Sequence, residues 1–331
     1  MTILLGGAGA VGARAARQLV DTPGVEHVLV ADRDARRARS VVEVMSPKAE
    51  VTDWRPGDPM PGGVSVLACA LPGGVDAVAA PPAVDAGVDV VSCADDRAGI
   101  AALLALGARA RRTGSRIVMG AGLAPGLTDV LAAHAGAALD TVTTVRVARS
   151  GTAGPACRDA LRRALRERPR ELRAGRWNED PRRGGHELVW FPDPVGAAEC
   201  HLVDGGVELL HDGFPGLERA SVRFAAPPSR GWAPFPVRRA ADTGWAAARV
   251  EVDGRRGVAW ETLVYGVVER AEVAAGTVLA TVAAHLAGAL TVGPTLAPGA
   301  TGLARAVDPV AFLAELMTRG VRAAAFEGTP V

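Results

Sequence analysis

The first residues suited to chemistry form a glycine-rich run near the start of the chain, Gly7-Ala8-Gly9-Ala10-Val11-Gly12, with the spacing G-x-G-x-x-G. Gly9 has no side chain, so a pyrophosphate can approach the backbone, and a helix beginning there offers it N–H groups. Asp32 follows Gly12 by twenty residues and can accept hydrogen bonds from ribose hydroxyls. Together they predict a dinucleotide-binding turn made of Gly7, Gly9, Ala10, Val11, Gly12 and Asp32.

The residues around Asp32 bear on which dinucleotide is bound. Its carboxylate would repel a 2′-phosphate, which favours NAD over NADP. Arg33, Arg36 and Arg37 follow and could bind that phosphate, although Arg33 could equally stack on the adenine. We expect NAD as the cofactor and keep NADP as the alternative.

The segment Ser92-Cys93-Ala94-Asp95-Asp96 brings a thiol and two carboxylates to the end of an apolar run. Two adjacent acids can have separated pKa values and then serve as acid or base. We therefore take Cys93 and Asp96 as candidate catalytic residues and Asp95 as a candidate substrate contact. The alternative is that Asp95 or Asp96 only caps the following helix.

Two other turns follow apolar runs. Ala70-Leu71-Pro72 is expected to contact the cofactor. Gly122, Pro125 and Gly126 lie in a turn whose backbone N–H groups could bind a substrate carboxylate or the nicotinamide amide. Thr128-Asp129 could instead simply cap the next helix.

The middle of the chain offers fewer reactive groups. Thr152, within Ser150-Gly151-Thr152-Ala153-Gly154, could hydrogen-bond a substrate. His201, close to the carboxylate of Glu199, is the best imidazole candidate for a catalytic acid. The alternative is an ordinary surface or core histidine.

Apolar runs and helix-like segments alternate over the first part of the chain, as in a doubly wound parallel sheet. In such a sheet, ligands bind beyond the carboxyl ends of the strands, where the turns above would gather. A helix is expected over Ala98–Arg112. The expected strands are Thr2–Leu5, His27–Ala31, Glu50–Val51, Val64–Ala70, Val88–Ser92 and Arg116–Met119.

The pattern changes after residue 126. Ala248–Val252 and Val258–Val267 flank a glycine-containing turn and predict a hairpin. Val273–Leu290 and Pro309–Arg319 read as helices, and Val321–Phe326 as a last short strand. We expect a Rossmann domain, an inserted α+β domain with an antiparallel sheet, and C-terminal helices packing back on the Rossmann domain, over residues 1–126, 127–268 and 269–331.

Composition excludes several classes of protein. With 331 residues and a net charge of +1, the chain suits two domains and does not suit nucleic-acid binding. Lys48 is the only lysine, so a Schiff-base mechanism is not expected. The four cysteines form no C-x-x-C pair, so we expect no metal site and a reducing cytoplasmic location. Ala274–Gly293 is apolar but rich in alanine, which indicates a buried helix and no membrane partner.

Five features appear in order: Gly7–Gly12, Ala31–Asp34, Ala70–Gly73, Ala86–Val91 and Ala121–Leu127. In these the chain resembles the saccharopine dehydrogenase-like oxidoreductases, with homospermidine synthase as a more distant relative. The resemblance covers about the first 135 residues well. It implies a Rossmann fold, a nicotinamide cofactor and oxidoreduction of a C–N bond.

The chain also departs from that family. Ala124 stands where many members carry an aspartate, and the Lys and His pair of the lysine-pathway enzymes cannot be placed. The sequence therefore predicts an NAD(P)-dependent oxidoreductase that acts by hydride transfer on an amino-acid-like or imine substrate. That small molecule would carry a carboxylate, and the protein would be a homodimer. The alternatives are a non-catalytic NAD(P)-binding sensor and an enzyme that recycles tightly bound NAD.

Overall fold

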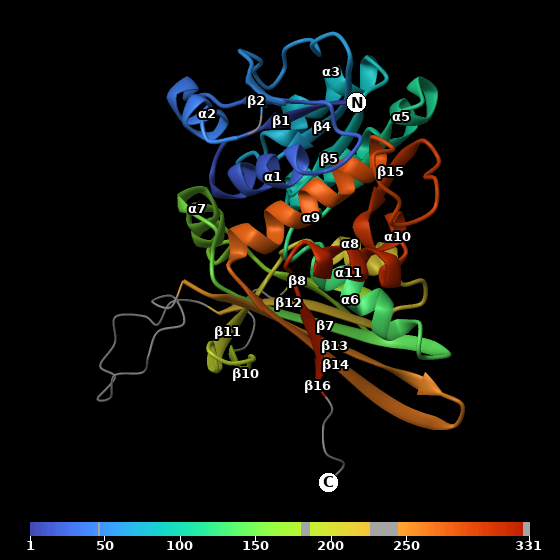
Figure 1. Cartoon of the computed structure of the whole chain (residues 1–331). Coiled ribbons are helices and arrows are strands. Elements are labelled where there is room, and N and C mark those ends of the chain that lie inside the picture. The colour runs from blue at the N-terminus through green and yellow to red at the C-terminus, as the bar shows by residue number, and fades with distance from the viewer. Residues whose placement is uncertain (46, 180–185, 226–243, 327–331) are drawn as a thin grey trace.

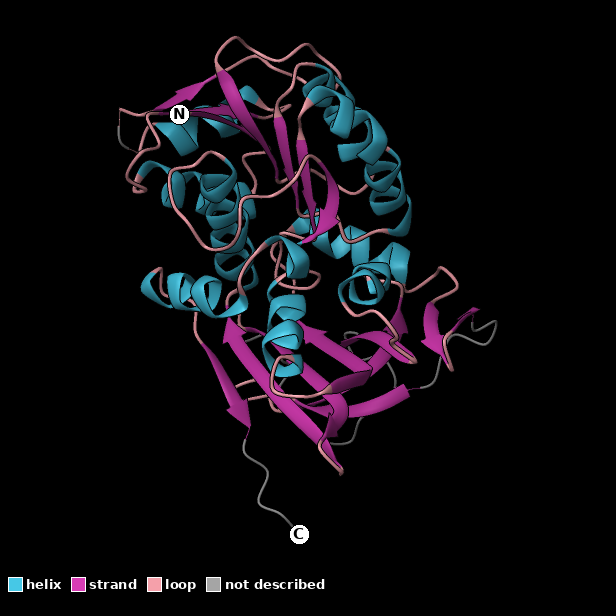
Figure 2. Ribbon diagram, turned by 90° about the vertical axis from the view of Figure 1, so that its right-hand side faces the viewer, coloured by secondary structure: helices cyan, strands magenta, loops and turns pink. Residues whose placement is uncertain are grey.

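The computed structural model describes residues 1–45, 47–179, 186–225 and 244–326. Two β-sheets lie at opposite ends of the molecule (Figure 1). Seen from the side, helices form a layer between these sheets (Figure 2). The first sheet comes mainly from the N-terminal part of the chain, and the second from the middle part.

The first sheet is parallel throughout. Within the described residues, its strands are β1 (Thr2–Gly6), β2 (His27–Ala31), β3 (Ala49–Val51), β4 (Val64–Cys69), β5 (Asp89–Ser92), β6 (Arg116–Met119) and β15 (Gly299–Gly302). Their order is β15-β6-β5-β4-β1-β2-β3. Without β15 this is the Rossmann order, with its switch point between β1 and β4. The predicted doubly wound parallel sheet is confirmed.

Helices alternate with these strands, as the sequence pattern predicts. They are α1 (Ala10–Val20), α2 (Ala35–Val42), α3 (Asp76–Asp85), α4 (Arg97–Ala105) and α5 (Gly107–Thr113). The single helix expected over Ala98–Arg112 is two helices, divided at Leu106. Gly107, the first residue of α5, lies against β15, since a Cβ there would be in van der Waals contact with Ala300 at 3.4 Å.

The second sheet is largely antiparallel, as predicted, and one parallel pair makes it mixed. Within the described residues, it consists of β7 (Thr141–Ser150), β8 (Arg170–Arg173), β9 (Arg176–Glu179), β10 (His186–Trp190), β11 (Ala197–Val203), β12 (Arg219–Ala225), β13 (Ala246–Arg256), β14 (Ala259–Glu269) and β16 (Ala323–Phe326). β12 pairs with β7 in parallel because the chain crosses over before it returns, and the other pairs are antiparallel. The predicted hairpin is the β13–β14 pair, with longer arms than expected.

The remaining helices are α6 (Leu127–Gly136), α7 (Pro155–Ala164), α8 (Val207–Gly213), α9 (Ala271–Leu286), α10 (Leu303–Ala306) and α11 (Pro309–Thr318). The C-terminal part of the chain contributes to both sheets. β15 adds a strand beside β6, whereas β16 pairs with β14. The chain therefore returns to each sheet after it has completed most of both.

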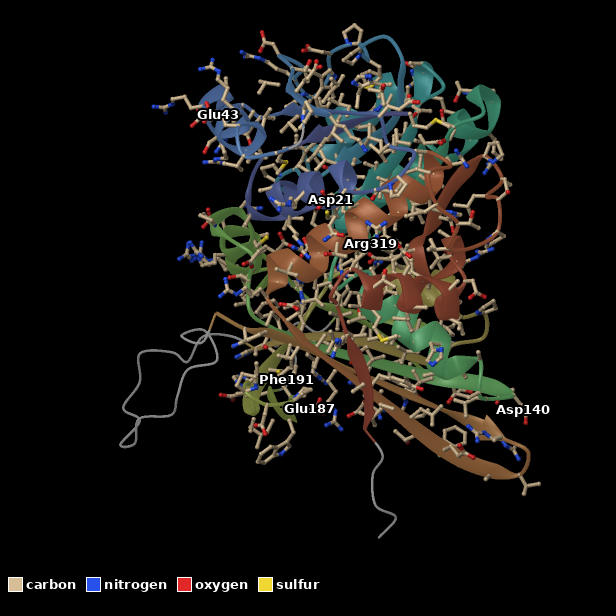
Figure 3. All side chains as sticks on the ribbon, in the orientation of Figure 1. Asp21, Glu43, Asp140, Glu187, Phe191 and Arg319 are labelled. Atoms are coloured by element: carbon tan, nitrogen blue, oxygen red, sulfur yellow. The ribbon has the colours of Figure 1, made fainter. Side chains whose placement is uncertain are left out.

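Hydrogen bonds tie the C-terminal helices to the start of the chain. Arg319, at the end of α11, lies in the middle of the molecule (Figure 3). Its guanidinium donates to Gln18 at 3.3 Å and to Thr22 at 3.1 Å, and Arg14 donates to its carbonyl oxygen at 3.3 Å. These bonds connect α11 to α1 across almost the whole length of the chain.

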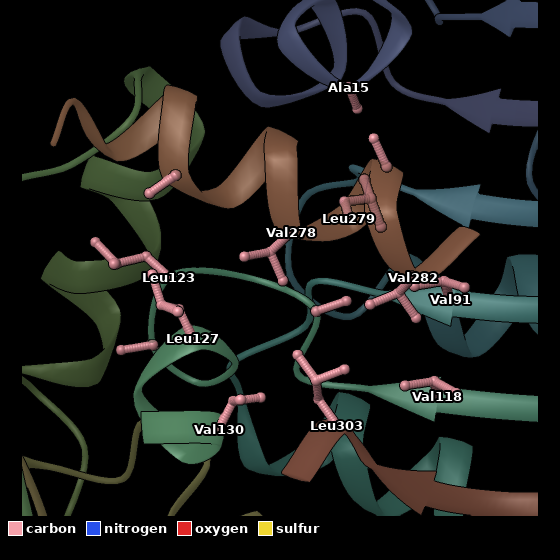
Figure 4. Packing of buried hydrophobic residues seen from close by; sticks show 14 of the residues in the cluster. Ala15, Val91, Val118, Leu123, Leu127, Val130, Val278, Leu279, Val282 and Leu303 are labelled. Carbon is pink, nitrogen blue, oxygen red and sulfur yellow. The ribbon is translucent and has the colours of Figure 1, made fainter. Parts of the chain in front are cut away.

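The core between the sheets is built around α9. Val278, Leu279 and Val282 of this helix pack among residues of α1, β5, β6, α6 and α10 (Figure 4). A Cβ on Gly276 would lie 2.6 Å from the carbonyl oxygen of Val11, so only glycine allows α9 to approach α1 so closely. Among the described helices, none has both the length and the apolar character needed to cross a bilayer.

Candidate active site

The glycine turn joins β1 to α1. Gly7 has a φ of +99°, which side chains rarely adopt, and a Cβ there would clash with the loop after β4. A Cβ on Gly12 would clash with the carbonyl oxygen of Gly7, so the helix can pack on the turn only with glycine at this position. A Cβ on Gly9 would meet no heavy atom within 4 Å. The turn is thus tight on one side and open on the side where a phosphate would approach.

Asp32 follows β2 and braces this turn. Its Oδ2 accepts a hydrogen bond of 2.8 Å from the N–H of Ala8, and its Oδ1 accepts one of 2.9 Å from Asp34. Ala10 and Val11 begin α1, whose N-cap residue has no side chain to bond the first N–H groups. Free N–H groups and a carboxylate therefore lie together, as a dinucleotide would require.

The loop Ala70–Pro72 leaves β4 directly beside the glycine turn. The N–H of Ala70 donates to the carbonyl oxygen of Gly6 at 2.8 Å, and the carbonyl oxygen of Ala70 lies against Gly7. Arg33 is exposed next to Asp32. The structure therefore brings together the predicted cofactor contacts from three connections, those after β1, β2 and β4.

A cavity of about 130 Å³ lies beside these connections. One wall comes from the loops after β4 and β5, at the carboxyl ends of parallel strands, where open α/β sheets bind their ligands. The opposite wall comes from β7, α7 and the end of β11. Among its charged side chains are Asp95, Asp96, Arg97, Arg149, Arg163 and Asp204.

Arg149 reaches this cavity from β7. Its Nη2 forms an ion pair of 2.8 Å with Oδ2 of Asp95, across the space between the two sheets. Its guanidinium also lies 4.8 Å from the ring centroid of Phe224, which faces it on β12. Its Nε is buried and has no hydrogen-bond partner among the described residues. One donor of Arg149 therefore remains available to a ligand.

The two carboxylate oxygens of Asp96 have different surroundings. Its Oδ1 accepts a hydrogen bond of 2.8 Å from the N–H of Gly99 and so caps α4, as the alternative interpretation proposed. Its Oδ2 is buried and lacks a hydrogen-bond partner in the described part of the chain. Because buried polar atoms are nearly always paired and Asp96 lines the cavity, this oxygen is a candidate ligand contact.

Arg97 and Asp204 form a second connection across the cavity. The guanidinium of Arg97 donates to Asp204 and, at 3.0 Å, to Glu179. Burial raises the pKa of Asp204, although Arg97 opposes this shift. Two ion pairs, Asp95–Arg149 and Arg97–Asp204, thus hold the first sheet against the second at this cleft.

Cys93 precedes the acid pair and is only partly exposed. Burial raises the pKa of its thiol well above the usual range, and the negative charge of Asp76 raises it further. The thiol therefore keeps its proton at neutral pH, which argues against a thiolate nucleophile at this position.

The turn after β6 is closed on itself. Gly122, Pro125 and Gly126 are buried, and the N–H of Gly122 donates to the carbonyl oxygen of Pro125 at 3.1 Å. The N–H of Leu127 donates back to Gly122 at 2.9 Å. The N–H of Gly122 is therefore occupied within the turn, which argues against its predicted role in binding a substrate.

Thr152 and His201 are not among the walls of this cavity. Thr152 precedes α7 in a loop that approaches the start of α1, since a Cβ on Gly154 would lie 4.0 Å from that of Ala10. His201 pairs with Phe224 in the sheet, two strands from Arg149.

The surroundings of His201 also weaken its case as an acid. Its ring centroid lies 4.2 Å from that of His186, and Nδ1 of His186 lies 2.5 Å from Glu199. Burial lowers the pKa of His201. The ring is therefore neutral at neutral pH and carries no extra proton to donate.

Sequence reasoning missed several of the charged residues in the cleft, among them Arg149 and Asp204. Arg149 follows Thr143–Ala148, whose alternation predicts a half-exposed strand, and its only signal is the glycine-containing turn that comes after it. Asp204 comes directly after an apolar strand and before Gly205, so it shows the same acid-at-strand-end signal that identified Asp95. The described residues contain no cluster of His, Cys, Asp or Glu that could hold a metal ion.

Comparison with known proteins places the fold. No protein-family model matches the chain. Apo saccharopine dehydrogenase (L-Glu forming) from Saccharomyces cerevisiae is similar, with a TM-score of 0.68, 13% identity, and coverage of 98% of this chain and 100% of that one. DAP dehydrogenase from C. glutamicum, in complex with DAP, matches with a TM-score of 0.51, 15% identity, and coverage of 97% and 99%.

An engineered D-amino acid dehydrogenase bound to NADP+ matches with a TM-score of 0.50, 16% identity, and coverage of 97% and 99%. At these identities the likeness establishes architecture. The chain therefore has the fold of saccharopine dehydrogenase, a Rossmann sheet joined to a second, mixed sheet.

Proposed function

We propose that this protein is an NAD(P)-dependent oxidoreductase acting on the C–N bond of an amino-acid-like or imine substrate. One observation carries the proposal. A cleft holding unpaired donor and acceptor atoms lies at the carboxyl ends of β4 and β5, beside a complete dinucleotide turn. A protein that only senses a dinucleotide would not need such a second site.

The residues around the turn fit a nicotinamide dinucleotide. The open space at Gly9 and the first N–H groups of α1 would receive the pyrophosphate. Asp32 would accept the ribose hydroxyls, and Ala70–Pro72 would line the same site. The carboxylate of Asp32 favours NAD, so we propose NAD and keep NADP as the alternative. When bound, the cofactor would supply or accept the hydride.

The cleft fits a substrate that carries both a carboxylate and a nitrogen. Arg149 offers an unpaired Nε on a guanidinium that Phe224 and Asp95 already orient. Such a planar donor suits a carboxylate. Asp96 lines the same cavity, and its unpaired Oδ2 would hold the proton that the substrate nitrogen gains or loses. The loop after β5 would position both Asp96, which belongs to it, and Arg149, which pairs with its Asp95.

Two of the similar structures support a substrate of this kind. DAP dehydrogenase was solved with DAP, and the D-amino acid dehydrogenase with NADP+. Both match this chain over almost their whole length. We propose the same division of labour here, with the cofactor on the first sheet and the substrate between the two.

Calorimetric titration with NAD, NADH, NADP and NADPH tests the cofactor, with the Asp32→Ala variant beside the parent. We expect one oxidised and reduced pair to bind and Asp32→Ala to weaken that binding. A spectrophotometric screen of amino acids and imines then follows NAD(P)H. Steady turnover supports the proposal, whereas binding without turnover across the screen favours a sensor. Product formation without net NADH, from protein that retains NAD, favours the recycled cofactor.

A further inference from the structure

A buried carboxyl group lies behind the acidic loop, which we define as Cys93–Asp96. Asp76, in the first turn of α3, is only 2% exposed. Its Oδ2 accepts a hydrogen bond from the hydroxyl of Ser92, the last residue of β5. Its Oδ1 is buried and has no hydrogen-bond partner within the described residues. Asp76 thus lies too deep to touch a ligand in the cleft and can act only through its neighbours.

Ser92 passes this interaction on to the acidic loop. Its Oγ accepts a hydrogen bond of 2.9 Å from the N–H of Ala94, the residue before Asp95. The hydroxyl therefore donates to Asp76 and accepts from Ala94, which fixes its orientation on both sides. Asp95 and Asp96 follow at once, one paired with Arg149 and the other facing the cavity.

We propose that Asp76 is a positioning residue of the candidate active site, holding the acidic loop in place through the chain Asp76 Oδ2, Ser92 Oγ and Ala94 N. The geometry of the loop does not depend on which ligand binds. The effect of Asp76 on turnover, in contrast, rests on the proposed function.

The surroundings of Asp76 reduce its negative charge, which suits a residue that lies behind two other carboxylates. Burial raises its pKa to about 7, and the charges of Asp96 and Asp95 raise it as well, while the Ser92 hydroxyl opposes them. The thiols of Cys69 and Cys93 face it from β4 and from the acidic loop. With a pKa of about 7, this carboxyl group is partly protonated at neutral pH and adds less negative charge beside Asp95 and Asp96 than an ordinary aspartate would.

Alkylation of Cys93 by iodoacetamide reports on the loop without any substrate, and peptide mass spectrometry separates it from the other cysteines. Asp76→Ala and Asp76→Asn both remove the charge, but only asparagine keeps an acceptor for Ser92. We expect Cys93 in Asp76→Ala to react about tenfold faster than in Asp76→Asn, the effect of one net hydrogen bond. In Ser92→Ala, which leaves the Asp76 carboxyl in place, Cys93 should also react about tenfold faster than in the parent.

Asp129→Asn is the matched control. Asp129 is another buried aspartate in the first turn of a helix, with one unpaired oxygen and a pKa that burial raises to about 7. Its replacement should leave the Cys93 rate within about twofold of the parent, whatever it does to Tm. In the unaltered protein, the amide of Ala94 should be protected from hydrogen exchange, and Ser92→Ala should remove that protection.

Equal Cys93 rates in Asp76→Ala and Asp76→Asn, together with an unchanged rate in Ser92→Ala, would overturn the proposal. An equal acceleration in Asp129→Asn would also overturn it, because the effect would then be general loosening. If Asp76→Ala does not fold, the Cys93 rate in Ser92→Ala and the hydrogen exchange of the Ala94 amide still test the proposal. A positive result in protein that turns over no amino acid or imine would uphold the positioning role and count against the proposed function alone.

Discussion

Two neighbouring connections at the carboxyl ends of the first sheet's strands differ in how their polar groups are paired. The turn after β6, Gly120–Gly126, is buried, and the N–H groups of Ala121 and Gly122 donate to the carbonyl oxygens of Ser92 and Pro125. The loop after β5, Cys93–Asp96, is partly exposed, pairs with Arg149 across the cleft and keeps one carboxylate oxygen unpaired. The contrast teaches that position at a strand end does not make a binding site. Polar groups that line a cavity and lack partners are better candidates.

If this distinction holds, changes in the turn after β6 should affect stability and changes in the loop after β5 should affect ligands. Gly126→Ala should have the largest effect. Gly126 has a φ of +134°, and a Cβ there would clash with the carbonyl oxygens of Gly120 and Gly122. We expect the free energy of unfolding to fall by about 4 kcal/mol or more, measured by urea denaturation.

Gly114→Ala is the control for that change. Gly114 also has a positive φ, of +84°, but a Cβ there would meet no heavy atom within 4 Å. Its replacement should cost only about 1 kcal/mol, from the left-handed backbone alone. Similar losses in the two variants would contradict the closed packing described for the β6 turn.

The stability of the protein should depend on pH through the ionisation of Asp129, a buried carboxyl that follows the same turn. Burial raises its pKa from 3.8 to about 7, so its contribution to stability is full below the unfolded pKa and is lost as the pH rises through about 7. Asp129→Asn stays neutral. Its Tm relative to the parent should therefore rise between about pH 5 and about pH 8, by the equivalent of up to about 3 kcal/mol. A pH-independent difference in Tm would show that Asp129 ionises normally.

In the loop after β5, Asp96→Asn should lower kcat by about a hundredfold, because the amide cannot take up a proton. Asparagine caps helices as well as aspartate does, so the cap on Gly99 and the Tm should be retained. Cofactor affinity by calorimetry should also be unchanged. Unaltered turnover would remove Asp96 from the proposed mechanism and leave it as a cap.

Arg149→Lys should have the smallest effect of the four. Lysine keeps the charge but cannot stack on Phe224 or offer a planar pair of donors, so KM for the substrate should rise about tenfold with little change in kcat. Arg146→Lys is the matched control. Arg146 lies on the opposite face of the same strand and pairs with Glu251 and Asp253. An equal rise in KM there would mean that the strand, not the cleft, is responsible.

Much of the first sheet could be predicted because its strands are short apolar runs separated by glycine turns. His27–Ala31 and Arg116–Met119 have the predicted bounds. β15, in contrast, is Gly-Ala-Thr-Gly, which has no apolar run to mark it. The mixed pairing of β7 with β12 depends on a crossover between distant segments, and neither strand's own pattern encodes it.

The candidate site was predictable in part for the same reason. Local motifs identified the glycine turn, Asp32 and the acidic loop, since each lies within one short segment. Arg149 could not be found, because its importance comes from Asp95 and Phe224, which are distant in sequence. The choice among Asp96, Cys93 and His201 as catalytic residues, the domain limits and the homodimer stay predictions.

Strands β15 and β16 lie near the C-terminal end of the chain, so they are synthesised after the strands with which they pair. β15 closes the outer edge of β6, and β16 closes the outer edge of β14. During synthesis both edges must wait, with their backbone groups unpaired, until about residue 300 and then residue 326 have left the ribosome. A nascent chain that stalls before Gly299 would have β6 and β14 as sheet edges in place of β15 and β16.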